Sequence, residues 1–162
     1  MTKDKSSPGG VQFMSDLHLE ASEVYATFDF PVTAPYLLLS GDVGSLADYE
    51  EYMGFIKRQT ERYAGVLLVL GNHEFHGLDY GTTLDKAKEL EAEPSLEGRL
   101  HVLHRRRFDV PGTNVSILGC TLWTTIPGRQ RRQLWVGSRI FNTSKVGISR
   151  CITQPTPRTW CG

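Results

Sequence analysis

The sequence has no long apolar segment and no recognisable export signal. No apolar run approaches the ~20 residues that a membrane-spanning helix needs. The first ten residues, MTKDKSSPGG, are polar and lack the apolar stretch of a signal peptide. We therefore expect residues 1–10 to form a flexible lead and the protein to be cytoplasmic, without a membrane partner.

Cysteine is scarce, with only Cys120, Cys151 and Cys161 in the chain. An odd number without any Cys-x-x-Cys pair argues against a disulfide framework or a zinc ribbon, so free thiols are expected. A chain of 162 residues can bury a core without such cross-links, which become necessary only below roughly 40 residues. The sequence predicts a single globular unit.

Acidic residues are absent from the last part of the chain. Residues 129–162 carry 7 Lys and Arg and no Asp or Glu, whereas residues 1–128 carry 11 Lys and Arg and 18 Asp and Glu. At the earlier frequency, the tail would hold about five acidic residues. We interpret 129–162 as an irregular basic tail. One hypothesis is that it binds nucleic acid or an acidic membrane surface.

Apolar runs and turn residues predict alternating strands and helices within residues 11–128. The expected strands are 11–15, 36–40, 66–70, 100–103 and 115–123, and the expected helices are 46–63 and 82–93. Ser45 and Asp48 have the spacing of a capping box. A strand–helix–strand order makes 36–40 and 66–70 parallel neighbours. A turn at 111–114 predicts a hairpin of 106–110 with 115–120.

Polar groups follow three of these strands at the point where each one ends. Asp16 and His18 follow the first, Asp42 follows the second, and Asn72 and His73 follow the third. In an open α/β sheet, ligands bind outside the carboxyl ends of the strands, so these groups should share one crevice. Carboxylate, imidazole and amide oxygen suit Mn²⁺, Fe or Zn²⁺. Each motif alone is typical of a turn or an N-cap, but the set together indicates a metal site.

The stretches "SDLHLE", "LLLSGDVG" and "LVLGNHEF" resemble the calcineurin-like metallophosphoesterases, in particular the small predicted phosphoesterases of that family. The resemblance covers residues 11 to about 125. It implies an αββα sandwich with a mixed sheet built from βαβ units. It also implies two divalent metal ions (Mn, Fe or Zn) and a phosphate-ester substrate.

The resemblance also assigns roles to individual residues. Asp16 and His18 would bind the first metal, Asp42 would bridge, Asn72 would bind the second, and His73 would contact the phosphate and protonate the leaving group. A histidine suits this last role because its pKa lies near neutral pH. Glu74 could orient His73, although a surface acid is the favoured interpretation.

Family members also use three histidines from their second half, one in a His-His strand end and two in a Gly-His-x-His motif. This chain has neither motif, and its other histidines are His76, His101 and His104. His76 is the best of these as a ligand, by proximity. The fold class expected is therefore a partial sandwich whose C-terminal half is missing, with impaired hydrolysis.

The genetic code suggests an explanation for the tail. In a shifted frame, the third base of each codon is read together with the first two bases of the next codon. Between Arg129 and Gly162, no codon of this frame has to be a stop codon. The shifted frame permits a series that resembles the segment after the corresponding strand in this family. We hypothesise that 129–162 is frameshifted or mis-spliced, which sequencing the transcript across the Gly128 codon would test.

Other classes of function stay open. The chain could be a non-catalytic fragment, or a phosphate-binding module with a basic tail. A receiver-like module is disfavoured because its phosphorylated Asp should end the third strand, where this chain has Asn72 and His73. The run 105–107, three arginines, is interpreted as a solvated face because residues 1–128 are net acidic, so no nucleic-acid partner is expected there.

Overall fold

Four parallel strands form the sheet at the centre of the protein. The structure, a computed structural model, describes residues 10–123. The strands lie in the order β1–β2–β3–β4, and all three pairings between neighbours are parallel. They span Val11–Met14 (β1), Tyr36–Ser40 (β2), Gly65–Val69 (β3) and Leu100–Val102 (β4). The predicted pairing of the second strand with the third is confirmed.

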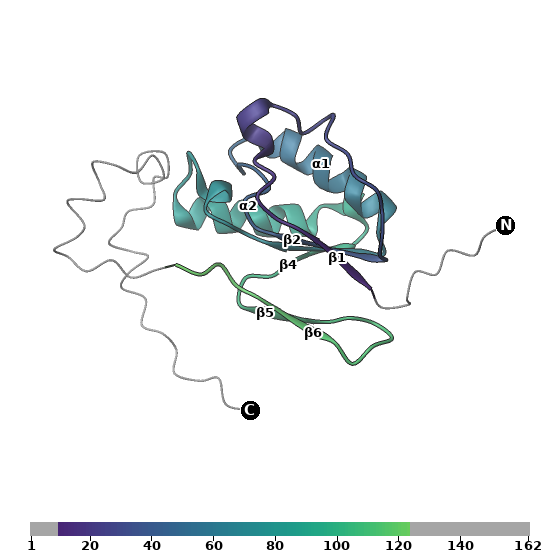
Figure 1. Ribbon diagram of the computed structural model, residues 1–162. Coiled ribbons are helices and arrows are strands. Elements are labelled where there is room, and N and C mark those ends of the chain that lie inside the picture. The colour runs from purple at the N-terminus through teal and green to yellow at the C-terminus, as the bar shows by residue number, and fades with distance from the viewer. Residues whose placement is uncertain (1–9, 124–162) are drawn as a thin grey trace, which may run out of the picture.

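Both helices cover the same face of this sheet (Figure 1). Helix α1 (Tyr49–Arg62) connects β2 to β3, and α2 (Tyr80–Ala92) connects β3 to β4. Each connection moves one strand further in the same direction, and right-handed crossovers then place the helices on one side. The core between helices and sheet contains Leu37, Leu39, Tyr52, Phe55, Ile56, Leu68 and Leu90. This arrangement confirms the α/β class.

The opposite face of the sheet meets a two-stranded hairpin (Figure 1). Strands β5 (Arg106–Asp109) and β6 (Ser116–Gly119) pair antiparallel, which confirms the predicted hairpin. The Phe108 ring lies 5.9 Å from the Tyr36 ring and 4.8 Å from the His101 ring, centroid to centroid. The hairpin thus packs on β2 and β4 through one aromatic side chain.

The predicted capping box at the start of α1 is wrong. Asp48 occupies the N-cap position, but its side chain makes no capping hydrogen bond. The buried Ser45 hydroxyl instead accepts from the Ala47 N–H at 3.1 Å and donates to the His76 carbonyl at 3.1 Å. Ser45 therefore joins the loop before α1 to the loop after β3.

Three short 3₁₀ helices complete the described chain: η1 (Leu19–Ser22), η2 (His73–Phe75) and η3 (Pro94–Leu96). No helix within the described residues has the length and apolarity to cross a membrane. Cys120 is a free thiol, as expected. The predicted tail, its two cysteines and all of the predicted lead except residue 10 lie outside the described residues.

Candidate metal centre

The loops that follow β1 and β2 are joined along their backbones. The Asp16 N–H donates to the Gly41 carbonyl at 3.1 Å, and the His18 N–H donates to the Asp42 carbonyl at 3.0 Å. The Leu19 N–H continues the series by donating to the Val43 carbonyl at 3.0 Å. Because these bonds fix the two loops side by side, the side chains of both loops extend from one end of the sheet.

Three predicted ligands have left-handed backbone conformations. The φ angles are 57° at Asp16, 49° at His18 and 53° at Asp42. Such conformations cost about 1–3 kcal/mol each for residues other than glycine, and they are common at functional sites. They bring one donor atom from each of the three side chains within 4.8 Å of the other two. The predicted convergence of β1 and β2 residues is therefore present.

The loop after β3 contacts Asp42 through Gly71. A methyl group on Gly71 would lie 2.2 Å from Asp42 Oδ1, so only glycine leaves room for that carboxylate. The same oxygen accepts a hydrogen bond from the His73 N–H at 2.8 Å. Asn72 lies between these two contacts, and its Nδ2 is buried without a partner within residues 10–123. All three strand ends therefore meet at Asp42.

Glu74 is buried, so its interpretation as a surface acid is wrong. Its Oε2 accepts from the N–H groups of Gly71 at 2.6 Å and Asp42 at 3.1 Å. Its Oε1 accepts from the Val43 N–H at 2.8 Å and the Tyr52 hydroxyl at 3.2 Å. No contact with the His73 ring is present among these bonds. One carboxylate thus fixes the loops after β2 and β3 together.

Burial raises the pKa of Glu74 to about 7, against the hydrogen bonds from Gly71 and Val43, which lower it. The backbone donors explain why a carboxylate can occupy this position at all, since an unpaired buried charge would be far more costly. Glu74 acts on the site by holding the Asp42 backbone.

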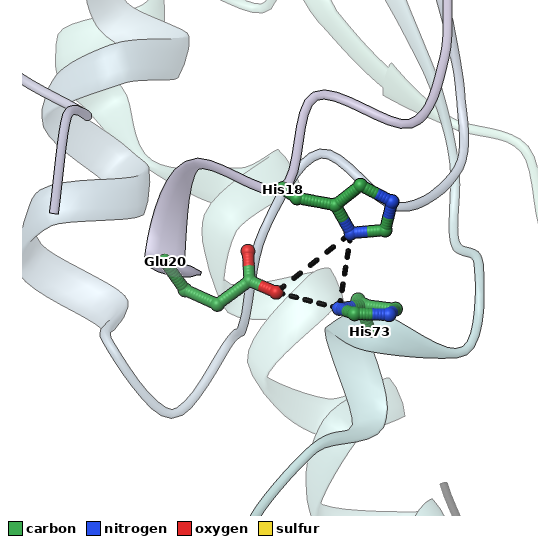
Figure 2. Close-up of side chains that lie close together, drawn as sticks. All are labelled: His18, Glu20 and His73. Atoms are coloured by element: carbon green, nitrogen blue, oxygen red, sulfur yellow. Dashed lines mark hydrogen bonds and ion pairs between the residues drawn. The ribbon is translucent and has the colours of Figure 1, made fainter. Parts of the chain in front are cut away.

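His18, Glu20 and His73 form a cluster (Figure 2). The His73 Nδ1 lies 2.5 Å from Glu20 Oε1 and 3.2 Å from His18 Nδ1. The His18 Nδ1 lies 4.0 Å from the same Glu20 oxygen. The two imidazole rings meet edge to face, with centroids 4.2 Å apart. Glu20 holds the His73 ring through Nδ1, and no side chain within residues 10–123 bonds its Nε2.

The family of this chain follows from its sequence. The sequence matches the calcineurin-like phosphoesterase family over residues 11–145. The chain belongs to this family. Its described part is consistent with a partial metallophosphoesterase fold, and phosphoester hydrolysis is the general chemistry of the family.

Solved and curated proteins add one further comparison. The phosphopantetheinyl hydrolase PptH from Mycobacterium tuberculosis is similar in structure, with 20% sequence identity and a TM-score of 0.44. The match covers 67% of this chain and 41% of that chain. This chain thus spans less than half of that hydrolase. No curated protein matches the sequence.

The chain has three other histidines. His76 packs against His73, whereas His101 and His104 lie away from the candidate ligands. The His76 ring packs on the His73 ring with centroids 4.1 Å apart, and burial lowers its pKa. His101 contacts Phe108, and the His104 Nε2 lies 3.4 Å from the Tyr80 hydroxyl. None of the three belongs to a group of possible metal ligands in the described part of the chain.

Two site residues received no correct role from sequence reasoning. Glu20 stands two residues after His18 within the stretch "SDLHLE", but nothing in its spacing indicates contact with His73, which is 53 residues away. Glu74 follows His73 directly, and a carboxylate in a loop is usually exposed. Glu20 contacts His73 from the loop after β3, and Glu74 accepts from Asp42 and Val43 in the loop after β2. Only the folded chain brings these residues together.

Proposed function

We propose that this chain binds divalent metal ions through Asp16, His18, Asp42 and Asn72 and hydrolyses a phosphate ester, with His73 contacting the phosphate. The convergence of the Asp16, His18 and Asp42 donor atoms within 4.8 Å of one another is the observation that carries the proposal. Membership of the calcineurin-like phosphoesterases supports it.

The residues fit a cation. Two carboxylates and one imidazole are a donor set that suits Mn²⁺, Fe or Zn²⁺. Asp42 Oδ1 already accepts the His73 N–H, which orients the carboxylate and leaves its second oxygen for a second ion. The side-chain amide of Asn72 makes no hydrogen bond to the described residues, so its oxygen is available as a ligand.

The chemistry divides between the ions and the protein. Divalent cations held by these residues would supply the Lewis acidity for attack on the phosphoryl group. His73 would donate a proton from Nε2 to the leaving-group oxygen. Glu20 supports this role because its bond at Nδ1 fixes the ring orientation.

We expect hydrolysis by this chain to be slow. Within residues 10–123, the second ion has only Asp42 and Asn72 of the assigned ligands, whereas the family resemblance implies three further histidines. A non-catalytic, phosphate-binding chain is the alternative, and the incomplete second position is the feature that favours it.

The test is Mn²⁺-dependent hydrolysis of a generic aryl phosphodiester and the matching monoester by the full chain. Asp42→Asn should lower the rate by about 10²-fold or more, the size of loss seen when one charge-stabilising group is removed. Asp85→Asn, on the exposed face of α2, is the matched control and should keep the rate. Equal rates for wild type and Asp42→Asn, both above background, would refute the metal mechanism. Binding of Mn²⁺ and phosphate without turnover would support the non-catalytic alternative.

A further inference from the structure

Three donor atoms from two loops face one another (Figure 2). His18 Nδ1, Glu20 Oε1 and His73 Nδ1 are separated by 2.5, 3.2 and 4.0 Å. His18 and Glu20 come from the segment after β1, and His73 comes from the segment after β3. The fold therefore gathers two imidazoles and one carboxylate at a point that the assigned roles do not explain.

If hydrogen bonding alone joined these three atoms, a single N–H would have to serve two acceptors. A neutral imidazole has one N–H and one lone pair. If His73 Nδ1 donates to Glu20, it offers no lone pair to His18 Nδ1, which lies 3.2 Å away. A single cation would accept a lone pair from each atom. With metal–ligand bonds of ~2.0–2.2 Å, tetrahedral ligand atoms lie about 3.4 Å apart, and the observed separations bracket that value.

The surroundings of Glu20 also suit a cation. Its side chain is 16% exposed, and its Oε2 is buried without a hydrogen-bond partner in the described part of the chain. The ion pairs of Glu20 within residues 10–123 are with His18 and His73, and none is with Lys or Arg. The histidine side chains are 38% and 24% exposed, which leaves access for water as a fourth ligand.

We propose that His18, Glu20 and His73 bind one Zn²⁺ at a second site, which shares only His18 with the Asp16–His18–Asp42 group. Two imidazoles and one carboxylate are a donor set that zinc uses with water in the fourth position. Because a neutral imidazole offers one lone pair, His18 can serve only one of the two cations at a time. Zinc bound here removes His18 from the other group and occupies His73, so zinc should inhibit Mn²⁺-dependent hydrolysis. Only this inhibition rests on the proposed function.

The binding test uses Co²⁺ as a spectroscopic substitute for zinc on the full chain, followed by displacement with Zn²⁺. Wild type should bind one Co²⁺ with the intense visible absorption of four-coordinate cobalt. Glu20→Gln should weaken binding by at least about 10–100-fold, a loss that even residues supporting a ligand can cause. Glu23→Gln, an exposed acid three residues away, is the matched control and should bind as wild type does. Asp42→Asn should keep this spectrum, since Asp42 belongs to the other group.

Two outcomes would overturn the proposal. One is absence of four-coordinate cobalt in the wild type. The other is cobalt binding that Asp42→Asn abolishes and Glu20→Gln leaves intact, which would make Glu20 and His73 an ion pair only. Circular dichroism verifies that each variant folds. If Glu20→Gln does not fold, His73→Gln compared with His101→Gln gives the same discrimination. Loss of hydrolysis in Asp42→Asn together with an intact cobalt spectrum distinguishes the two proposals.

Discussion

Replacement of Glu74 by Leu should destabilise the protein by about 2–6 kcal/mol. The carboxylate accepts from Gly71 and Asp42 on one oxygen and from Val43 and Tyr52 on the other. A leucine side chain of similar size has no acceptor for these donors. At least two buried donors then lose their acceptor, and each such loss costs about 1–3 kcal/mol.

Equilibrium unfolding in urea, followed by circular dichroism, measures this effect. The midpoint should fall while the slope stays unchanged, because the mutation alters stability and not the area exposed on unfolding. Glu50→Leu, on the exposed face of α1, is the control and should stay within about 0.5 kcal/mol of wild type. A loss below about 1 kcal/mol for Glu74→Leu would refute the argument that this carboxylate holds the loops together. The affinity for Mn²⁺ should fall with stability, since the Asp42 backbone loses its acceptor.

Two further predictions concern packing and pH. Gly71→Ala should destabilise the protein and weaken Mn²⁺ binding, because the new methyl group would lie 2.2 Å from Asp42 Oδ1. The control is Gly54→Ala in α1, where the space around the new methyl group is open, and it should stabilise the protein by up to about 1 kcal/mol. Thermal melts test both, and unchanged Mn²⁺ affinity in Gly71→Ala would contradict the contact. Burial lowers the pKa of His101 from 6.5, so protonation favours the unfolded state and stability falls as pH drops below about 6.5. His101→Phe should preserve the contact with Phe108. Between about pH 7.5 and 5.5, its melting temperature should fall by less than that of the wild type. An equal fall in both proteins would show that another group dominates.

Most of the fold can be predicted from local pattern. The expected strand Tyr36–Ser40 has the same bounds in the structure, and Gly65–Val69 and Leu100–Val102 differ from their predictions by one residue. Continuous apolar runs bounded by turn residues are distinctive because a strand covered on both faces needs them. Helix α1 begins three residues later than expected, since Ser45 bonds to the loop after β3 and not to the helix. Local spacing could not reveal that partner.

By itself the sequence determined the α/β class, the parallel pairing of the second and third strands and the positions of Asp16, His18, Asp42, Asn72 and His73 at strand ends. These features depend on periodicity and turn chemistry, which act over a few residues. Only the tertiary structure decided that Glu20 meets His73 and that Glu74 is buried beneath the Asp42 loop. Each of these carboxylates has at least one partner on another strand end, and their burial depends on how the loops after β1, β2 and β3 pack together. Contacts between residues far apart in the chain form only when the sheet has assembled.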